Sequence, residues 1–156
     1  MKALCLTLMI AIVIGAISVS FANTYERKDF NYRSYKPNTP IGFYTGKTCD
    51  FINIDHVVSL KDAYESGAAN WSASKKETFA NDRRNHVPSC GRVNSSKGSE
   101  GPSDFMRRSR DGRGLEYKIV RFCEYVQKYY AVKLKYELSL QDNDSATFNR
   151  CGVSVD

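Results

Sequence analysis

The stretch "NIDHVVSL" (residues 53–60) decides how this chain is interpreted. It places His56, one of only two histidines, directly after Asp55 and directly before two valines. β-Branched residues favour strands, so we predict a strand that runs through Val58. Histidine is the side chain best suited to proton transfer near neutral pH. The stretch therefore holds either a reactive pair or a buried structural pair.

The position of the pair on a strand limits what it can do. Neighbouring residues of a regular strand point to opposite faces. Asp55 and His56 can therefore serve one site only where the strand ends or bends, with one side chain on each side. We accordingly expect a hairpin whose strands and following helix surround the site.

The start of the chain has a different character from the rest. In residues 1–22, Lys2 precedes a long apolar run, and small residues follow at the end, "SFA". This pattern is typical of a secretory signal peptide, and a membrane anchor is the alternative. The remaining length suits one domain. We predict a secreted protein with an N-terminal arm at residues 23–48, a domain at 49–140 that includes a C-terminal helix, and a tail at 141–156.

Cysteine usage agrees with export. Cys5 lies in the predicted signal peptide, which leaves Cys49, Cys90, Cys123 and Cys151. An even number in an exported chain implies two disulfides with three possible pairings. We favour Cys49–Cys90 and Cys123–Cys151, because each pair then lies within one half of the domain. The absence of a C-x-x-C pair argues against a four-cysteine zinc site.

The chain is basic, with 23 Lys and Arg against 17 Asp and Glu and a formal charge of +6. Such a balance suits a polyanionic partner, which includes nucleic acid, an acidic polysaccharide and an anionic membrane surface. Charge alone does not choose among these partners, and a basic surface that only keeps the protein soluble is the alternative. The basic segment "RRSRDGRG" (residues 107–114) is either a linker or a contact to a phosphate backbone.

Three helices are expected around the strands. "KDAYES" (residues 61–66) predicts a short helix closed by Gly67, and "NWSASKKETFAND" (70–82) predicts a second one. In the second, Ser74 and Glu77 have the spacing of a capping box, and Trp71 and Phe79 are expected to pack it onto the core. Residues 115–140 predict the third, with an apolar stripe and with the intervening Tyr and Lys facing solvent or a partner. The stripe consists of Ile119, Phe122, Cys123, Val126, Tyr130 and Leu134.

Polar residues after the opening stretch supply what phosphodiester hydrolysis needs. That reaction requires a base for water and a positive charge for the phosphate oxygens. His56 can be the base, while Asp55 and Asn94 are hard oxygen ligands suited to Mg²⁺. Lys97 lies on the same helical face as Asn94 and can meet a phosphate as a point charge. Arg92, on the same segment, is expected to bind substrate.

The ordered set Asp-His, Asn, Asn resembles the HNH nucleases of the ββα-metal class. Residues 54–105, "IDHVVSLKDAYESGAANWSASKKETFANDRRNHVPSCGRVNSSKGSEGPSDF", look like the HNH domain at the C-terminus of GmrSD-type restriction endonucleases, which also occurs alone in small secreted proteins. The likeness continues weakly into "YVQKYYAVKLKYELSL" (residues 125–140). The resemblance implies an α+β fold with a ββα-metal core, additional packing helices and the two disulfides.

The resemblance also implies a role for each matched residue. It makes His56 the general base, Asp55 and Asn94 the ligands of Mg²⁺ or another divalent cation, and Lys97 a basic residue near the scissile phosphate. Asn85 matches the middle asparagine, whose side chain holds the hairpin loop so that the histidine is aimed. His86 stands beside this position, and for it we expect a packing or surface role.

The function expected from the sequence is therefore a secreted, metal-dependent HNH endonuclease. It acts as a monomer on nucleic acid, with sequence-nonspecific DNA as the expected substrate and RNA as the alternative. Two other functions remain open. One is an exported toxin or effector nuclease, and the other is a non-catalytic basic protein that binds nucleic acid or polysaccharide on an inactive HNH scaffold.

Overall fold

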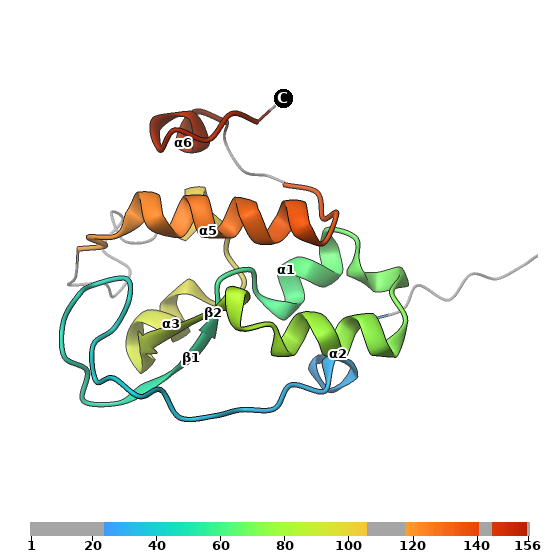
Figure 1. Ribbon diagram of the computed structural model, residues 1–156, viewed down its shortest axis with the longest axis horizontal. Coiled ribbons are helices and arrows are strands. Elements are labelled where there is room, and N and C mark those ends of the chain that lie inside the picture. The colour runs from blue at the N-terminus through green and yellow to red at the C-terminus, as the bar shows by residue number, and fades with distance from the viewer. Residues whose placement is uncertain (1–23, 106–117, 141–144, 156) are drawn as a thin grey trace, which may run out of the picture.

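The computed structural model describes residues 24–105, 118–140 and 145–155 (Figure 1). Its sheet is a two-stranded antiparallel hairpin of β1 (Ile52–His56) and β2 (His86–Cys90). The register pairs Asp55 with Val87 and His56 with His86. Helix α3 (Gly91–Lys97) follows β2 directly. The predicted α+β fold with a ββα core is confirmed.

The segment between the strands is helical. It contains α1 (Leu60–Glu65), the 3₁₀ turn η2 (Ala68–Asn70), α2 (Ala73–Asn81) and the 3₁₀ turn η3 (Arg83–Asn85). The hydroxyl of Ser59 caps α1 by accepting a hydrogen bond from the Asp62 amide. Gly67 follows α1 with a φ of 140°, a backbone conformation that favours glycine. The helix predicted for "KDAYES" and its closure by glycine are confirmed.

The capping residue of α2 differs from the prediction. Ser72, and not Ser74, is the N-cap, since its hydroxyl accepts a hydrogen bond from the Lys75 amide at 3.2 Å. Ser74 lies inside the helix, where its carbonyl accepts a hydrogen bond from the Thr78 hydroxyl. Glu77 forms an ion pair with Arg33 of the N-terminal arm. The capping box predicted from Ser74 and Glu77 is wrong, because the helix begins two residues earlier.

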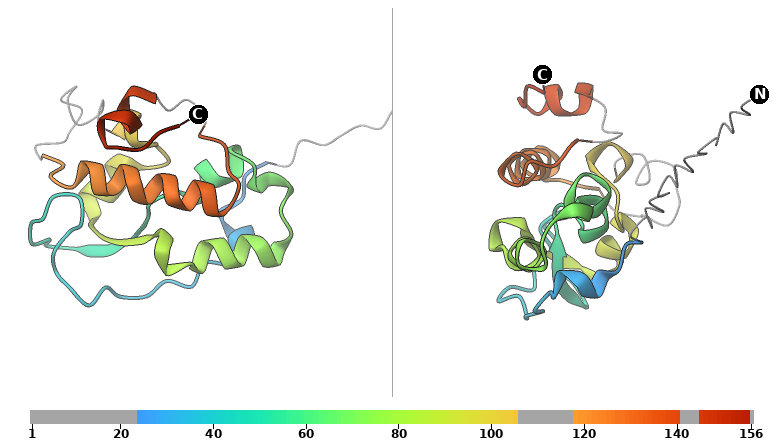
Figure 2. Two further views of the ribbon diagram at one scale, coloured as in Figure 1. Left: turned by 45° about the horizontal axis from the view of Figure 1, so that its top comes forward. Right: turned by 90° about the vertical axis from the view of Figure 1, so that its right-hand side faces the viewer.

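The long C-terminal helix is shorter than predicted. Helix α5 spans Phe122–Lys135, and α6 (Ser145–Arg150) follows it. Both views in Figure 2 show α5 between α6 and the rest of the domain. The disulfide Cys123–Cys151 ties the end of the chain to α5, and Cys49–Cys90 joins the N-terminal arm to the end of β2. The predicted disulfide pairing is confirmed.

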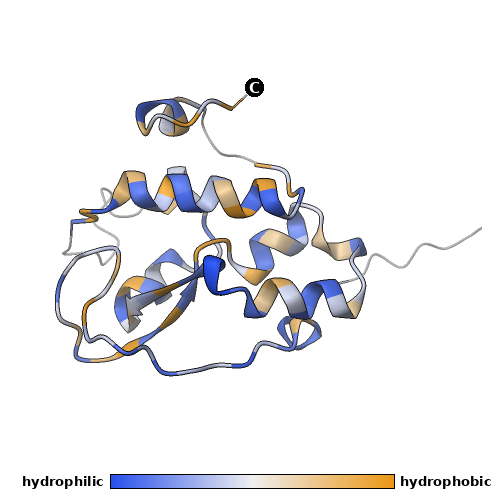
Figure 3. Ribbon diagram, in the orientation of Figure 1, coloured by the Kyte–Doolittle hydropathy of each residue, from blue (hydrophilic) through white to orange (hydrophobic). Residues whose placement is uncertain are grey.

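The predicted apolar stripe is confirmed only in part. Ile119 and Val126 are buried as predicted, whereas Leu134 is 66% exposed. Tyr125, Tyr129 and Lys133, which lie outside the predicted stripe, are buried. Lys133 is tolerated there because its ammonium donates hydrogen bonds to Asp62 at 2.6 Å and to the Ser66 hydroxyl at 2.7 Å. Hydrophilic and hydrophobic residues alternate along this helix (Figure 3). The prediction that the intervening Tyr and Lys face solvent or a partner is wrong for Tyr125, Tyr129 and Lys133, whose side chains are buried.

Aromatic rings form much of the core. Phe79 packs against Trp71 at 5.6 Å between ring centroids, as predicted, and Tyr44 contacts Phe105 and Tyr125 edge to face. The core therefore joins the arm, the hairpin and α5. Rings packed edge to face contribute beyond their buried area.

The first part of the N-terminal arm runs along the hairpin on the side away from α5 (Figure 1), whereas Tyr44 near its end contacts Tyr125 of α5. It begins with the 3₁₀ turn η1 (Arg27–Phe30), whose Phe30 is fully buried. Within the arm, Ile41 and Thr48 form an isolated antiparallel bridge. The arm is thus fixed by side chains more than by backbone pairing.

Two predictions fall outside the described residues: the signal peptide at 1–22 and the basic linker at 107–114. Within the described part of the chain, no helix has the length and apolar character needed to cross a membrane.

Candidate active site

His56 occupies the last position of β1 and is only 5% exposed. Its Nε2 lies 2.8 Å from the carbonyl oxygen of Ala80 at the end of α2. A carbonyl oxygen can only accept, so Nε2 carries the proton and the neutral ring presents Nδ1 as its acceptor. The fold therefore fixes one tautomer of His56, and this tautomer leaves a lone pair for a proton.

Burial lowers the pKa of His56 to about 3. Desolvation is the largest cause, and the positive charges of His86, Arg27 and Lys97 lower the pKa further, against the opposing effect of the Ala80 carbonyl. The ring is therefore neutral at physiological pH. A neutral ring is the form that a general base requires.

Three aromatic rings gather at this end of the hairpin. The ring of Tyr32 from the arm meets that of His56 edge on at 4.5 Å between centroids, and His86 lies 4.7 Å away. The Nε2 of His86 shares the Ala80 carbonyl at 2.9 Å, and its Nδ1 lies 3.2 Å from the Tyr35 hydroxyl. Both ring nitrogens of His86 thus have a hydrogen-bond partner, Tyr35 for Nδ1 and Ala80 for Nε2.

Asn85 holds the loop that follows His56. Its side chain accepts a hydrogen bond from the Val58 amide at 2.8 Å and donates one to the Val58 carbonyl at 3.0 Å. Its backbone carbonyl also accepts from the Val57 amide. Asn85 is fully buried, so these bonds are formed away from competing water. It positions β1 and does not itself reach the surface.

Asp55 and Lys97 form a buried ion pair on the other face of β1. The Lys97 ammonium, which is 0% exposed, lies 3.2 Å from an Asp55 carboxylate oxygen and 2.9 Å from the His56 carbonyl oxygen. The Tyr44 hydroxyl donates to the same carboxylate at 2.5 Å. Burial raises the pKa of Asp55, against the lowering effect of Lys97 and Tyr44. Lys97 therefore braces the end of β1 and has no surface from which to touch a phosphate.

Asn94, on α3, is partly buried and donates a hydrogen bond to the side chain of Asn53 at 3.0 Å. Asp55 and Asn94 carry hard oxygens of the kind that Mg²⁺ prefers. In this arrangement they do not fit a divalent ion, because both oxygens of the Asp55 carboxylate face Lys97 and one also binds Tyr44. No group of three or more His, Cys, Asp or Glu among the described residues is placed to hold a metal.

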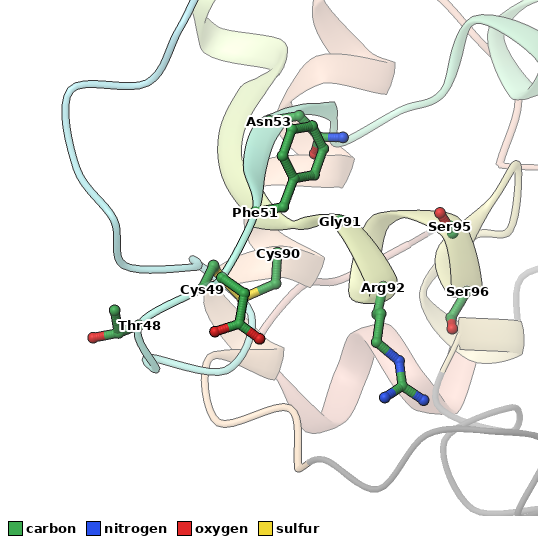
Figure 4. Close-up of a pocket in the computed structure, with 10 residues that line it drawn as sticks. Thr48, Cys49, Phe51, Asn53, Cys90, Gly91, Arg92, Ser95 and Ser96 are labelled. Carbon is green, nitrogen blue, oxygen red and sulfur yellow. A yellow bond between two sulfur atoms is a disulfide. The ribbon is translucent and has the colours of Figure 1, made fainter.

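Arg92 lies apart from these residues. It lines a pocket of about 640 Å³ beside the Cys49–Cys90 disulfide, together with Phe51 and Asn53. Figure 4 shows its side chain extending away from Phe51 and Asn53. Phe51 is 69% exposed, so this face combines an aromatic ring with a cation. His56, Asp55 and Lys97 do not line this pocket.

A second pocket, of about 350 Å³, contains Asn94. It also contains Arg27 of the N-terminal arm, for which the sequence predicted no role. The Arg27 charge acts on the pKa of both His56 and Tyr32. The sequence did not predict this position for Arg27, because nothing in residues 23–48 shows that the arm folds back onto the hairpin.

A β-hairpin whose first strand ends in Asp-His, followed by a helix that carries Asn94, defines a ββα core of the HNH type. The family profile for "GmrSD restriction endonucleases, C-terminal domain" matches residues 17–148. The chain belongs to this family, so its domain is of a nuclease-related kind.

One curated relative is an "Uncharacterized secreted protein" from Arthroderma benhamiae. It is 34% identical over 91 residues, which is 57% of this chain and 40% of the relative. The chain thus spans less than half of the length of the relative that it matches. No solved structure matches the chain significantly.

Proposed function

We propose that this protein is a secreted endonuclease that hydrolyses phosphodiester bonds in nucleic acid, with DNA as substrate and no sequence preference. The observation that carries the proposal is the fixed tautomer of His56 in a domain of a nuclease-related family. Export agrees with the two disulfides and with the relative described as secreted. The apolar run in residues 1–22 would be the signal peptide.

In the proposed reaction His56 is the general base. Its Nδ1 takes a proton from water, the water oxygen bonds to phosphorus, and the P–O3′ bond breaks. The 3′ oxygen gains a proton from solvent, which leaves a 5′-phosphate and a 3′-hydroxyl. Asn85 and Lys97 act as positioning residues, because Lys97 binds the backbone carbonyl of His56 and Asn85 binds the backbone of Val58 in the loop that follows.

A pKa of about 3 makes the free His56 a weak base. A bound phosphodiester changes this, because a nearby negative charge stabilises the protonated ring and raises its pKa. Substrate binding thus increases the basicity of His56 where it is needed. The ring of Tyr32 must also move aside, since it contacts His56 directly.

Magnesium remains a prediction of the family resemblance. Binding through Asp55 would require the Lys97 ammonium to leave the carboxylate. Isothermal titration with Mg²⁺ and with Mn²⁺ tests this, with Asn94→Ala as the comparison. Binding that Asn94→Ala abolishes would support the metal site, and the absence of binding by the wild type would refute it.

The direct test of function is digestion of supercoiled plasmid by the disulfide-bonded protein, purified from the medium of a secreting host. We expect nicked and then linear DNA. Parallel reactions with added divalent cation and with EDTA show whether a metal is needed. Intact plasmid under both conditions, with a correctly folded protein, would refute the proposal.

A second candidate is a non-catalytic nucleic-acid-binding protein. The observation that favours it is the burial of both His56 and Asp55, which are 5% and 4% exposed. Under this alternative the plasmid stays intact while DNA still binds in a salt-dependent way, because phosphate contacts release counterions. The plasmid digestion and a DNA-binding assay at two salt concentrations separate the two functions.

A further inference from the structure

The pocket that contains Asn94 is built from three parts of the fold. Arg27 comes from η1, Lys61 from the start of α1, and Asn94 from α3. The pocket also includes Ser59, three residues after His56. It therefore lies where the N-terminal arm, the loop after β1 and the helix of the ββα core meet.

The charged side chains that line this pocket are basic. Arg27 is exposed, and no carboxylate of the described residues forms a salt bridge with it; its polar neighbour is the Tyr25 hydroxyl. Lys61 pairs with Glu65 at 3.6 Å, but both side chains are 50% exposed. Exposed pairs of this kind contribute little and exchange easily. An anion entering the pocket would thus meet one guanidinium that no carboxylate of the described residues neutralises and one weakly engaged ammonium.

The pocket also lies beside the loop that follows the proposed base. It includes Ser59, three residues after His56 in the chain, and Asn94 of the helix that follows β2. A phosphate held there by Arg27 would therefore lie next to the end of β1, although the arm and the strand are far apart in sequence.

We propose that this pocket binds a phosphate of the nucleic-acid strand, with Arg27 as the substrate-binding residue that holds it beside the loop that follows His56. The inference rests on the proposed nuclease function and adds a substrate contact to it. A guanidinium binds two phosphate oxygens in a fixed geometry, which an ammonium cannot do. Lys61 supplies additional charge, and Asn94 also lines the pocket.

The chain offers a matched control in Lys28. It follows Arg27 in the same 3₁₀ turn, its side chain is 81% exposed, and it is absent from the pocket. Arg27→Ala and Lys28→Ala each remove one exposed positive charge from η1. Arg27 lines the pocket and Lys28 does not, and the exposed pair of Lys28 with Glu26 at 3.9 Å contributes little. Arg27→Lys further separates bidentate binding from charge alone.

The experiment follows binding of a short DNA strand by NMR, in EDTA, through the side-chain amide signal of Asn94. A strand with uncharged methylphosphonate linkages is the second probe. We expect Arg27→Ala to weaken binding by about 10- to 100-fold, the loss of a charge-assisted contact. The salt dependence of binding should fall by about one phosphate contact. Lys28→Ala should leave the Asn94 response unchanged, and the uncharged strand should not produce it.

The outcomes separate this inference from the proposed function. Equal binding by Arg27→Ala and wild type, or an Asn94 signal that does not respond to DNA, overturns the phosphate site even if the plasmid is cut. Binding that depends on Arg27 in a protein that never cuts DNA upholds the site and refutes the nuclease. Loss of binding together with a lowered melting temperature in Arg27→Ala but not in Arg27→Lys would show a structural role instead.

Discussion

At the scale of single residues, the two histidines differ in the hydrogen bonding of their second ring nitrogen, Nδ1. His56 and His86 share the carbonyl of Ala80, at 2.8 and 2.9 Å. The Nδ1 of His86 is bound by Tyr35, whereas no described residue forms a hydrogen bond with the Nδ1 of His56. One ring is therefore satisfied by the fold, and the other retains an acceptor for chemistry.

The buried ring of His56 predicts acid sensitivity. Its pKa is about 3 in the folded state against 6.5 ordinarily, so the unfolded chain binds more protons between these values. Stability therefore falls as the pH falls through this window, by about 2 kcal/mol between pH 7 and pH 5. The lowered pKa of His86 acts in the same direction, and the raised pKa of Asp55 opposes both.

Urea denaturation of the wild type and of His56→Asn at pH 7 and pH 5 measures this effect. The variant should lose much of the pH dependence, because it removes the titrating ring. If the unfolding free energy of both proteins changed equally between pH 7 and pH 5, His56 would not be the group that causes the pH dependence.

Replacement of Lys97, which is buried against Asp55, is predicted to destabilise the protein. Removing one partner of a buried ion pair leaves an uncompensated charge and costs about 3–5 kcal/mol. Lys97→Ala should therefore unfold at markedly lower urea than wild type, while the exposed Arg92→Ala should stay within about 0.5 kcal/mol. If Lys97→Ala were as stable as wild type and lost only DNA affinity, Lys97 would be a phosphate contact, as the sequence first indicated.

At the scale of elements, the sequence was informative where patterns are local. The strand at Asp55 and His56 and the helix α1 followed from β-branched residues and a closing glycine, and both disulfides followed from the number and positions of the cysteines. The hairpin and its following helix were expected from the opposite faces of Asp55 and His56. The strand ends at His56, two residues before the predicted Val58. The wrong predictions arose where two local signals compete. Ser72 and Ser74 both precede helix formers, and only the structure shows which one caps α2.

The corrected cap predicts a difference between two serines. Ser72→Ala should destabilise the protein by about 1 kcal/mol, the usual cost of losing an N-cap. Ser74→Ala should be neutral or slightly stabilising, because alanine has the higher helix propensity. Thermal melts of the two variants compare them directly, and a larger loss in Ser74→Ala would restore the original capping box.

The candidate site was predictable only in part. The residue types of His56, Asp55, Asn85 and Asn94 followed from the motif, yet their burial did not. Whether Lys97 meets a phosphate or a carboxylate depends on which side chain lies above β1, and this is a tertiary property. For the same reason Arg27 escaped notice, because only folding brings the arm to α3.

At the scale of the whole molecule, the disulfides serve different parts. Cys49–Cys90 closes a loop that contains β1, α1 and α2, and Cys123–Cys151 holds the C-terminal segment on α5. We expect replacement of both Cys49 and Cys90 by Ala to cost about 4 kcal/mol in unfolding free energy by the chain-entropy estimate.

The matching Cys123→Ala/Cys151→Ala protein should keep the DNA-binding response at Asn94, since this bridge lies away from the hairpin. Urea denaturation measures the unfolding free energy of each double variant, and the Asn94 amide signal measures its response to DNA. A Cys49→Ala/Cys90→Ala protein that is as stable as wild type would contradict the stabilising role given to the Cys49–Cys90 disulfide.

The central claim is that His56 is the base of a nuclease, and one measurement tests it most directly. It is the initial rate of plasmid nicking by wild type, His56→Asn and His86→Asn at equal concentration, each verified as folded. We predict that His56→Asn loses at least about 10²-fold in rate, the usual contribution of a general base, while His86→Asn stays within a few fold of wild type. A folded His56→Asn protein that nicks at the wild-type rate would contradict the claim.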